Sequence, residues 1–209
     1  MKIAIIGMGN VGSALGKRFA ELGHQVIFGS RKNDAKTVAK AKSMKAALAS
    51  VSDAAAQGEV VILAVPWHAM NETLASAGNL DGKILLDCIN PLKADLSGLE
   101  VGTTTSGAEL IAKEAPGAKV VKIFNTTGAG NMASPVYGST KTTMFYAGDD
   151  SEAKKIAAKL ASELGFEPVD AGALSAARFL EPFAMLWIHM AIYQKQGPDF
   201  AFQMVRRPK

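Results

Sequence analysis

The feature that most constrains the fold of this chain is a glycine pattern near its N-terminus, Gly7-Met8-Gly9-Asn10-Val11-Gly12. It follows a short apolar run and precedes an amphipathic helical pattern. The first glycine allows a tight turn, the second lets the backbone approach a pyrophosphate, and the third lets the helix pack closely on the strand. Free N–H groups and the dipole at the helix start then face the anionic phosphates. The pattern therefore predicts a dinucleotide-binding unit, against the alternative of a purely structural glycine turn.

Short β-branched runs alternate with helical patterns along the first two-thirds of the chain, which is typical of βαβ units and a parallel sheet. We predict strands near residues 2–6, 25–29, 59–65, 83–88, 118–124, 142–147 and 166–169. We predict helices from the glycine pattern to Gly23 and over residues 34–49, 107–115 and 151–164. The expected fold is α/β, a Rossmann-type, doubly wound and mostly parallel sheet, with the dinucleotide-binding domain over residues 1–172.

The pattern changes after Gly172, where residues 176–193 form a helical stretch that is apolar over more than one face. Such a helix must be covered on several sides. Residues 173–209 are therefore expected to form a C-terminal helical segment. A homodimer contact and packing wholly within one monomer are both open at this point.

Composition limits the classes of partner. The net charge of +4 is too small to indicate nucleic acid, but it favours an anionic small molecule. The single cysteine, Cys88, excludes an internal disulfide and fits a reducing cytosol. We expect no secretory signal, because the apolar start leads directly into glycines. We expect no membrane span either, because residues 183–192 fall far short of the roughly 20 apolar residues required. We expect a cytoplasmic enzyme.

The end of the second predicted strand indicates which dinucleotide binds. NAD-specific domains place an acidic residue there to hold the ribose 2′-hydroxyl. This chain has Gly29-Ser30-Arg31-Lys32 instead, with no Asp or Glu before Asp34. A hydroxyl and a guanidinium match a phosphate dianion, whereas a carboxylate would repel it. The sequence therefore predicts NADP(H), bound by Ser30 and Arg31, rather than NAD(H); the alternative is a solvated basic loop.

Several motifs in the same order resemble the NADPH-dependent reductases of the deazaflavin coenzyme F-420. They are the glycine pattern, Ser30-Arg31, Ala64-Val65-Pro66-Trp67-His68, Tyr146-Ala147-Gly148-Asp149-Asp150 and the stretch from Phe166 to Ser175. The segment Val121-Lys122-Ile123-Phe124-Asn125-Thr126 is similar to the reductase domain of STEAP-type metalloreductases, in which electrons pass from NADPH to a flavin.

The resemblance implies roles for particular residues. Those that would contact the pyrophosphate are Met8, Gly9, Asn10 and Val11. Those that would border the nicotinamide and its ribose are Val65, Pro66 and Trp67. Asn125, Thr126 and Ala129 would lie where the electron acceptor stacks. The polar segment from Asn125 to Asn131 departs from the more apolar, proline-containing segment of the deazaflavin reductases, so both F-420 and a flavin stand as acceptors.

No catalytic residue is predicted to be essential. Hydride transfer between two stacked rings needs proximity, orientation and exclusion of water, and the sequence shows neither a Ser–His–Asp set nor a metal-ligand cluster. His68 follows a strand whose end lines the ligand crevice in such sheets, so it is a possible contact to cofactor or substrate. Asn90, before Pro91, is expected at the rim of the same pocket.

Two alternatives stay open at the level of sequence. One is a reductase of a small carbonyl or imine, which needs a proton donor, and His68 and Lys122 are the nearby candidates. Lys122 and Asn125 also match the spacing of a catalytic Lys/Asn pair of 3-hydroxyacid dehydrogenases. We reject that mechanism because three residues apart on a strand they would point to opposite faces. The other alternative is an NADP(H)-binding sensor without turnover.

Overall fold

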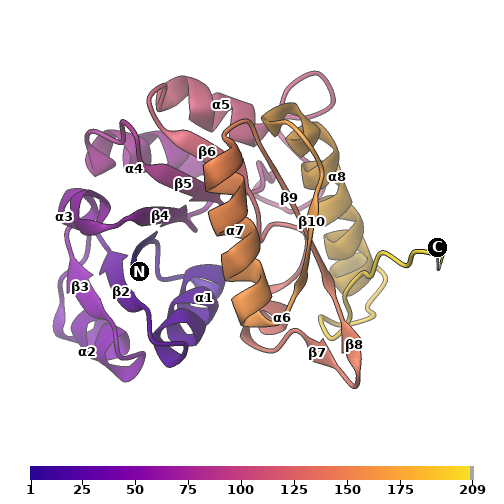
Figure 1. The fold of residues 1–209 in the computed structure, drawn as a ribbon, viewed down its shortest axis with the longest axis horizontal. Helices are drawn as coiled ribbons and strands as arrows, with labels where there is room; N and C mark the ends of the chain where they lie inside the picture. The colour runs from indigo at the N-terminus through magenta and orange to yellow at the C-terminus, as the bar shows by residue number, and fades with distance from the viewer. Residues whose placement is uncertain (208–209) are drawn as a thin grey trace.

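The computed structural model of the chain describes residues 1–207 and contains an eight-stranded sheet in the order β10-β9-β6-β5-β4-β1-β2-β3 (Figure 1). Its strands are β1 (Lys2–Ile6), β2 (Gln25–Gly29), β3 (Ala47–Ala49), β4 (Val60–Leu63), β5 (Ile84–Asp87), β6 (Lys119–Lys122), β9 (Thr143–Gly148) and β10 (Glu167–Asp170). The strands β1 to β6 are parallel and follow the 3-2-1-4-5-6 order of Rossmann domains. Strand β9 joins β6 antiparallel, and β10 continues parallel to β9. The predicted mostly parallel sheet is confirmed.

The helices connect these strands and cover the sheet. They are α1 (Asn10–Glu21), α2 (Ala35–Ser43), α3 (Val51–Gln57), α4 (Met70–Ala77), α5 (Gly107–Glu114), α6 (Ala129–Ala133), α7 (Ser151–Leu164) and α8 (Ala177–Ile188). Single helical turns lie at Trp67–Ala69, Leu174–Ala176 and His189–Tyr193, and β7 (Val136–Tyr137) pairs with β8 (Thr140–Lys141) in a small hairpin.

Alternating side chains of β1 enter two separate cores, one on each face of the sheet. Ile3 and Ile5 belong to the core that contains residues of α1 and α7, whereas Ala4 and Ile6 belong to the core that contains residues of α3, α4 and α5. All four side chains are buried. Strands covered on both faces are expected to be continuously apolar, as these are.

The predicted helix over residues 34–49 is wrong in its second half. Helix α2 ends at Ser43, and Lys45 adopts a left-handed conformation with φ of 56°. Ala47–Ala49 then form β3, which pairs in parallel with β2. Alanine favours helices, but pairing with the edge of the sheet overrides that weak preference here. The helices α3 and α4 were not predicted.

The predicted helix over residues 176–193 is divided in the structure. It consists of the regular helix α8 and a wider π-helical turn over His189–Tyr193. Figure 1 shows α8 beside β9 and β10, at the opposite end of the sheet from α2 and β3. The chain after α8 returns to the sheet, where the Phe202 carbonyl accepts a hydrogen bond from Thr143 N at 3.0 Å.

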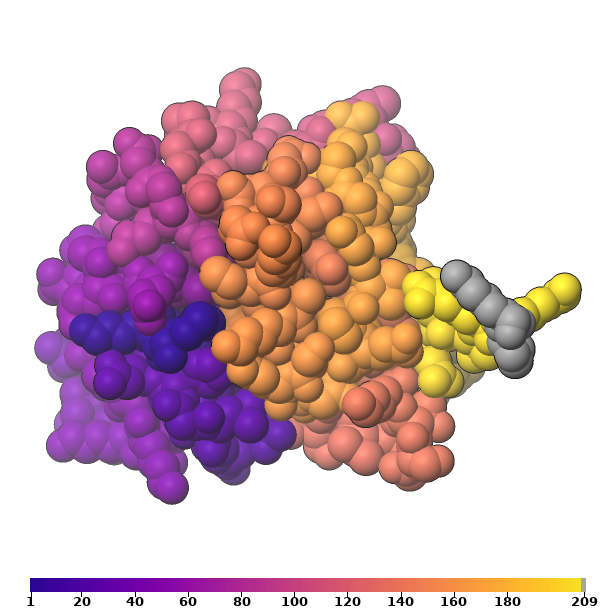
Figure 2. Space-filling view, viewed as in Figure 1, coloured from indigo at the N-terminus to yellow at the C-terminus, as the bar shows by residue number. Residues whose placement is uncertain are grey.

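Met204 N also donates to Thr143 Oγ1 at 2.9 Å, and beyond Met204 the chain leaves the sheet. Val205 is 81% exposed, and Figure 2 shows this end of the chain projecting from the body of the molecule. The last two positions of the predicted C-terminal segment, 208–209, lie outside the described residues. Among residues 1–207, no helix combines the length and apolarity needed to cross a membrane.

Candidate cofactor and acceptor site

The glycine pattern forms a phosphate loop, residues 7–12, between β1 and α1. Gly7 has φ of 109°, and a Cβ on it would lie 2.4 Å from the Ala64 carbonyl oxygen. A Cβ on Gly12 would lie 2.1 Å from the Gly7 carbonyl oxygen. A Cβ on Gly9 would meet no protein atom within 4 Å, and its φ of −70° suits any residue. The fold therefore requires Gly7 and Gly12, whereas Gly9 leaves open space in front of α1.

That open space lies at the positive end of a helix. Gly9 is the N-cap of α1, and no side chain caps this helix end. Lys40 of α2 also reaches the loop, and its Nζ donates to the Met8 carbonyl at 2.6 Å. The uncapped helix end, its dipole and a nearby ammonium group fit the pyrophosphate of a dinucleotide. The sequence reasoning missed Lys40, because it lies well beyond the basic residues at the end of β2.

A cavity of about 420 Å³, called the smaller cavity, lies beside the ends of β1 and β2. Its lining includes Ser30 and Arg31, together with Lys32 and Thr73. Ser30 Oγ accepts a hydrogen bond from Lys32 N at 3.1 Å, which fixes the turn after β2. The Arg31 guanidinium forms an ion pair with Glu72 of α4, with Nη1 and Oε1 2.5 Å apart. This partner of Arg31 was not predicted.

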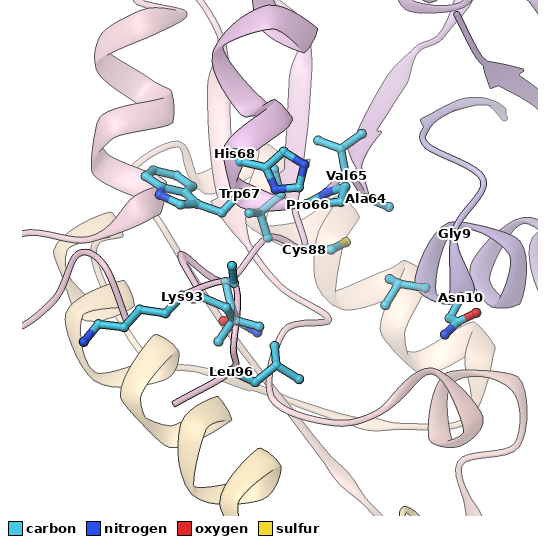
Figure 3. Close-up of a pocket in the computed structure, with 15 residues that line it drawn as sticks. Gly9, Asn10, Ala64, Val65, Pro66, Trp67, His68, Cys88, Lys93 and Leu96 are labelled. Carbon is cyan, nitrogen blue, oxygen red and sulfur yellow. The ribbon is translucent and has the colours of Figure 1, made fainter. Parts of the chain in front are cut away.

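A second cavity of about 450 Å³, called the larger cavity, begins at the phosphate loop. Its lining comes from three segments that follow β1, β4 and β5, and consists of residues 9–11, 64–68, 88–90, 92–94 and 96. Figure 3 shows Trp67 and His68 on one side, Lys93 and Leu96 on another, and Asn10 across from them. Val65 and Pro66 line both cavities, so the two adjoin at the end of β4.

The larger cavity offers little acid–base chemistry. Its ionisable lining groups are His68, Cys88 and Lys93. Burial raises the pKa of the Cys88 thiol well above its ordinary value, so it is neutral at physiological pH. Within residues 1–207, no group of three or more His, Cys, Asp or Glu side chains is arranged to hold a metal ion. The cavity is suited to holding a flat, largely apolar ring.

Lys122 does not line either cavity. Its side chain is fully buried, and its Nζ lies 2.8 Å from Asp87 Oδ2 and 2.8 Å from Glu181 Oε1. It also donates to the Ile89 carbonyl. Burial alone would lower the pKa of Lys122, but the two carboxylates raise it above its ordinary value. Lys122 is therefore a charged structural group rather than the proton donor that carbonyl or imine reduction would require.

The predicted acceptor-site residues divide into two groups. Asn90 lines the larger cavity, whereas Asn125, Thr126 and Ala129 do not belong to the lining of either cavity. Asn125 and Thr126 are buried just after β6. Asn125 reaches the cavity only through Asn90, because its Nδ2 donates to Asn90 Oδ1 at 3.0 Å.

The sequence reasoning also missed the loop that follows Asn90. Leu92, Lys93 and Leu96 line the larger cavity. Tyr193, after α8, holds this loop by donating its hydroxyl to the Asp95 carbonyl at 3.0 Å. A usable signal was present, since loops that follow parallel strands meet at the ligand-binding edge of such sheets.

Comparison with known proteins identifies relatives over most of the chain. A family model described as "NADP oxidoreductase coenzyme F420-dependent" matches residues 2–91. An F420-dependent NADP reductase of Methanothermobacter thermautotrophicus is 32% identical, and the match covers 92% of this chain and 90% of that protein. The metalloreductase STEAP3 of Rattus norvegicus is also 32% identical, over 86% of this chain, but the matched part is 36% of its length.

A solved structure shows the same similarity in three dimensions. The protein, from Arthrobacter sp. FB24, is described as a "putative f420 dependent nadp-reductase". It superposes with a TM-score of 0.90 at 32% identity, and the superposition covers 99% of this chain and 100% of that chain. The similarity therefore includes α8 and the segment after it, as well as the Rossmann-type sheet.

Proposed function

Because this chain belongs to the family of F420-dependent NADP reductases, it is an NADP-dependent oxidoreductase, and we propose that it transfers hydride between NADP(H) and the ring of coenzyme F-420 or of a flavin. The observation that carries this proposal is the larger cavity, which runs from the phosphate loop past Trp67 and is lined mainly by apolar groups. Two stacked rings need such a cavity, and they need no protein acid or base to exchange a hydride.

Different residues would hold different parts of the dinucleotide. The phosphate loop and the N-terminus of α1 would hold the pyrophosphate, with Gly9 leaving the space for it. Ser30 and Arg31, in the smaller cavity, would hold the 2′-phosphate. Val65 and Pro66, which line both cavities, would border the nicotinamide ribose. NADPH, when bound, supplies the hydride at the ring held in the larger cavity.

The remaining residues of the larger cavity would orient the acceptor. Trp67 forms a wall beside the nicotinamide position, and Asn90 lies at a neighbouring strand end with its side chain fixed by Asn125. The loop residues Leu92 and Leu96 would cover the cavity and exclude water. Asn125, Thr126 and Ala129 are proposed to lie beside the acceptor, with Asn125 acting through its hydrogen bonds to Asn90. We assign no residue as an essential proton donor; His68 is proposed as a contact to the acceptor.

Stopped-flow oxidation of NADPH tests the proposal. The enzyme is mixed with NADPH and, in parallel, with F-420, with flavins, and with a panel of small carbonyl and imine compounds. We expect rapid oxidation with a deazaflavin or flavin ring and none with the carbonyl or imine panel. Turnover confined to that panel would establish the carbonyl or imine reductase instead, and binding of NADPH without oxidation by any acceptor would establish a sensor.

We further propose that the enzyme is a homodimer formed through the outer face of α8. Phe179 is 76% exposed and Leu186 is 47% exposed, although both are large and apolar. They are seven residues apart on one helix, so they lie on the same side, with the half-buried Phe183 between them. A two-fold axis lets this stripe cover its own copy. Sedimentation equilibrium should give a dimer for the wild type and a monomer for Phe179→Asp with Leu186→Asp.

The proposed location is the cytoplasm. Its support is that Cys88 is the single cysteine, so the chain forms no internal disulfide and fits a reducing compartment. A small-molecule redox acceptor, rather than nucleic acid, agrees with the net charge of +4. Cell fractionation followed by immunodetection tests the location, and recovery in the membrane or extracellular fraction would contradict it.

A further inference from the structure

The smaller cavity has a carboxylate beside it where an NADP-specific site is expected to have none. Glu72 lies in the first turn of α4, next to Thr73, which lines the cavity. Its Oε1 is 2.5 Å from Nη1 of Arg31. Both side chains are more than half exposed, so the ion pair sits at the mouth of the cavity where a nucleotide would enter.

The position of this carboxylate resembles that of a group with a known role. In NAD-specific domains, an acidic residue near the end of the second strand holds the ribose 2′-hydroxyl. Here that strand is followed by Ser30 and Arg31, but Glu72 brings a carboxylate to the Arg31 guanidinium from a different element.

We propose that Glu72 is a specificity-determining residue whose carboxylate competes with the 2′-phosphate of NADP(H) for Arg31. It thereby reduces the preference of the enzyme for NADP(H) over NAD(H). This inference rests on the proposed placement of the 2′-phosphate at Ser30 and Arg31.

The competition follows from the charges. A bound 2′-phosphate either displaces Glu72 from the guanidinium or leaves two anionic groups beside one cation. Both outcomes cost free energy in a way that binding of NAD(H) does not, because its 2′-hydroxyl is neutral and can donate to a carboxylate. The pair is exposed, so water screens it and the effect on affinity is a small factor rather than orders of magnitude.

The test measures dissociation constants of NADP⁺ and NAD⁺ by isothermal titration calorimetry for the wild type and Glu72→Gln. Glu152→Gln is the matched control. Glu152 lies in the first turn of α7, outside both cavities, and forms an exposed ion pair with Lys155, so the substitution removes the same charge from a comparable pair. We expect Glu72→Gln to tighten NADP⁺ binding by about three- to fivefold. NAD⁺ binding should not tighten, and Glu152→Gln should change neither.

Three results would overturn the inference: NADP⁺ affinity that is unchanged in Glu72→Gln, affinity that falls, or a gain shared equally by NAD⁺. Arg31→Ala separates this failure from failure of the proposed binding mode. It should weaken NADP⁺ by about tenfold or more, the scale of a lost charge-assisted hydrogen bond, and leave NAD⁺ nearly unchanged. If Arg31→Ala alters neither affinity, the placement of the 2′-phosphate is wrong. If it weakens only NADP⁺ while Glu72→Gln has no effect, only the role of Glu72 is wrong.

Discussion

Asn90 and Asn125 exchange hydrogen bonds across two neighbouring strand ends. The Nδ2 of Asn90 donates to the Asn125 carbonyl at 2.9 Å, and the Nδ2 of Asn125 donates to Asn90 Oδ1 at 3.0 Å. Asn125 also donates to the Leu180 carbonyl of α8 at 3.1 Å. Asn125 thus positions a residue of the larger cavity and joins it to the C-terminal helix.

The first prediction follows from this exchange. Asn125→Ala should lower kcat/KM for the acceptor by about tenfold or more, because Asn90 loses one of the two hydrogen bonds that orient its side chain and small misplacements are costly. The dissociation constant of NADPH should change little, since the phosphate loop and Arg31 are untouched. Steady-state kinetics and calorimetry on one preparation measure both quantities. An equal loss in both would mean general damage to the fold instead of a positioning role.

The second prediction concerns Gly9. Substitution by Ala and then by Val should weaken binding of NADPH and NADH progressively, with Val abolishing it, because each side chain fills the space left for the pyrophosphate. Neither variant should lose its fold, because a Cβ at this position meets no protein atom within 4 Å. Thermal melting serves as the control. A folded Gly9→Val variant with wild-type affinity would refute the assignment of the loop.

The third prediction compares Trp67 with His68 in the larger cavity. Trp67→Ala should reduce kcat by about ten- to hundredfold, because the wall that aligns the nicotinamide is lost. His68→Ala should retain most of its turnover, whereas loss of a general acid–base catalyst typically costs about 10²–10⁴-fold. The measurement is kcat at saturating acceptor, with NADPH affinity determined separately. A drop of about a hundredfold in His68→Ala with intact NADPH binding would favour carbonyl or imine reduction.

The fourth prediction concerns the buried cluster of Lys122, Asp87 and Glu181. Lys122→Met should cost about 3–5 kcal/mol in the free energy of unfolding, because it leaves two buried carboxylates without their cation. Burial already raises the pKa of Glu181, and loss of the ammonium raises it further. A carboxyl group whose pKa is higher in the folded than in the unfolded state contributes most to stability at low pH, where it is protonated. This contribution is lost as the pH rises towards the folded pKa. The deficit relative to the wild type should therefore grow as the pH rises past the raised pKa of Glu181 in the wild-type fold.

Urea denaturation at several pH values measures this loss. Lys119→Met is the control, because Lys119 lies on the same strand but forms a partly exposed pair with Asp150, so its loss should matter far less. Equal stability of wild type and Lys122→Met would show that the cluster does not stabilise the fold.

The elements that could be predicted from sequence are those whose signals are local. β1 and β2 have the predicted bounds, because each is a short apolar run. Helix α7 matches its predicted range because Asp150 caps its start, accepting from Ala153 N at 2.8 Å, and Gly165 ends it with φ of 107°. By contrast, β3 exists only because β2 offers an open edge, and its sequence of alanine and leucine carries no strand signal.

The residues of the site also divide into those with a local sequence signal and those without one. The phosphate loop and the pair Ser30-Arg31 could be found because the motif and its spacing lie within one βαβ unit. Glu72 and Lys40 could not, because they reach the site from helices whose placement is decided by tertiary packing. Lys122 could only be weighed as a proton donor, because its partner Glu181 is distant in sequence and close only after folding.

Glu181 also determines how late in synthesis this fold reaches its full stability. Its carboxylate accepts from Gly107 N and Ala108 N at the start of α5 while it forms a second ion pair with Lys122, beside that of Asp87. Until α8 has emerged from the ribosome, the half-formed sheet contains an ammonium with one carboxylate and a helix start without its acceptors. The nascent sheet therefore stays short of its final stability through most of translation, and becomes fully stable only after α8 has left the ribosome and packed against it.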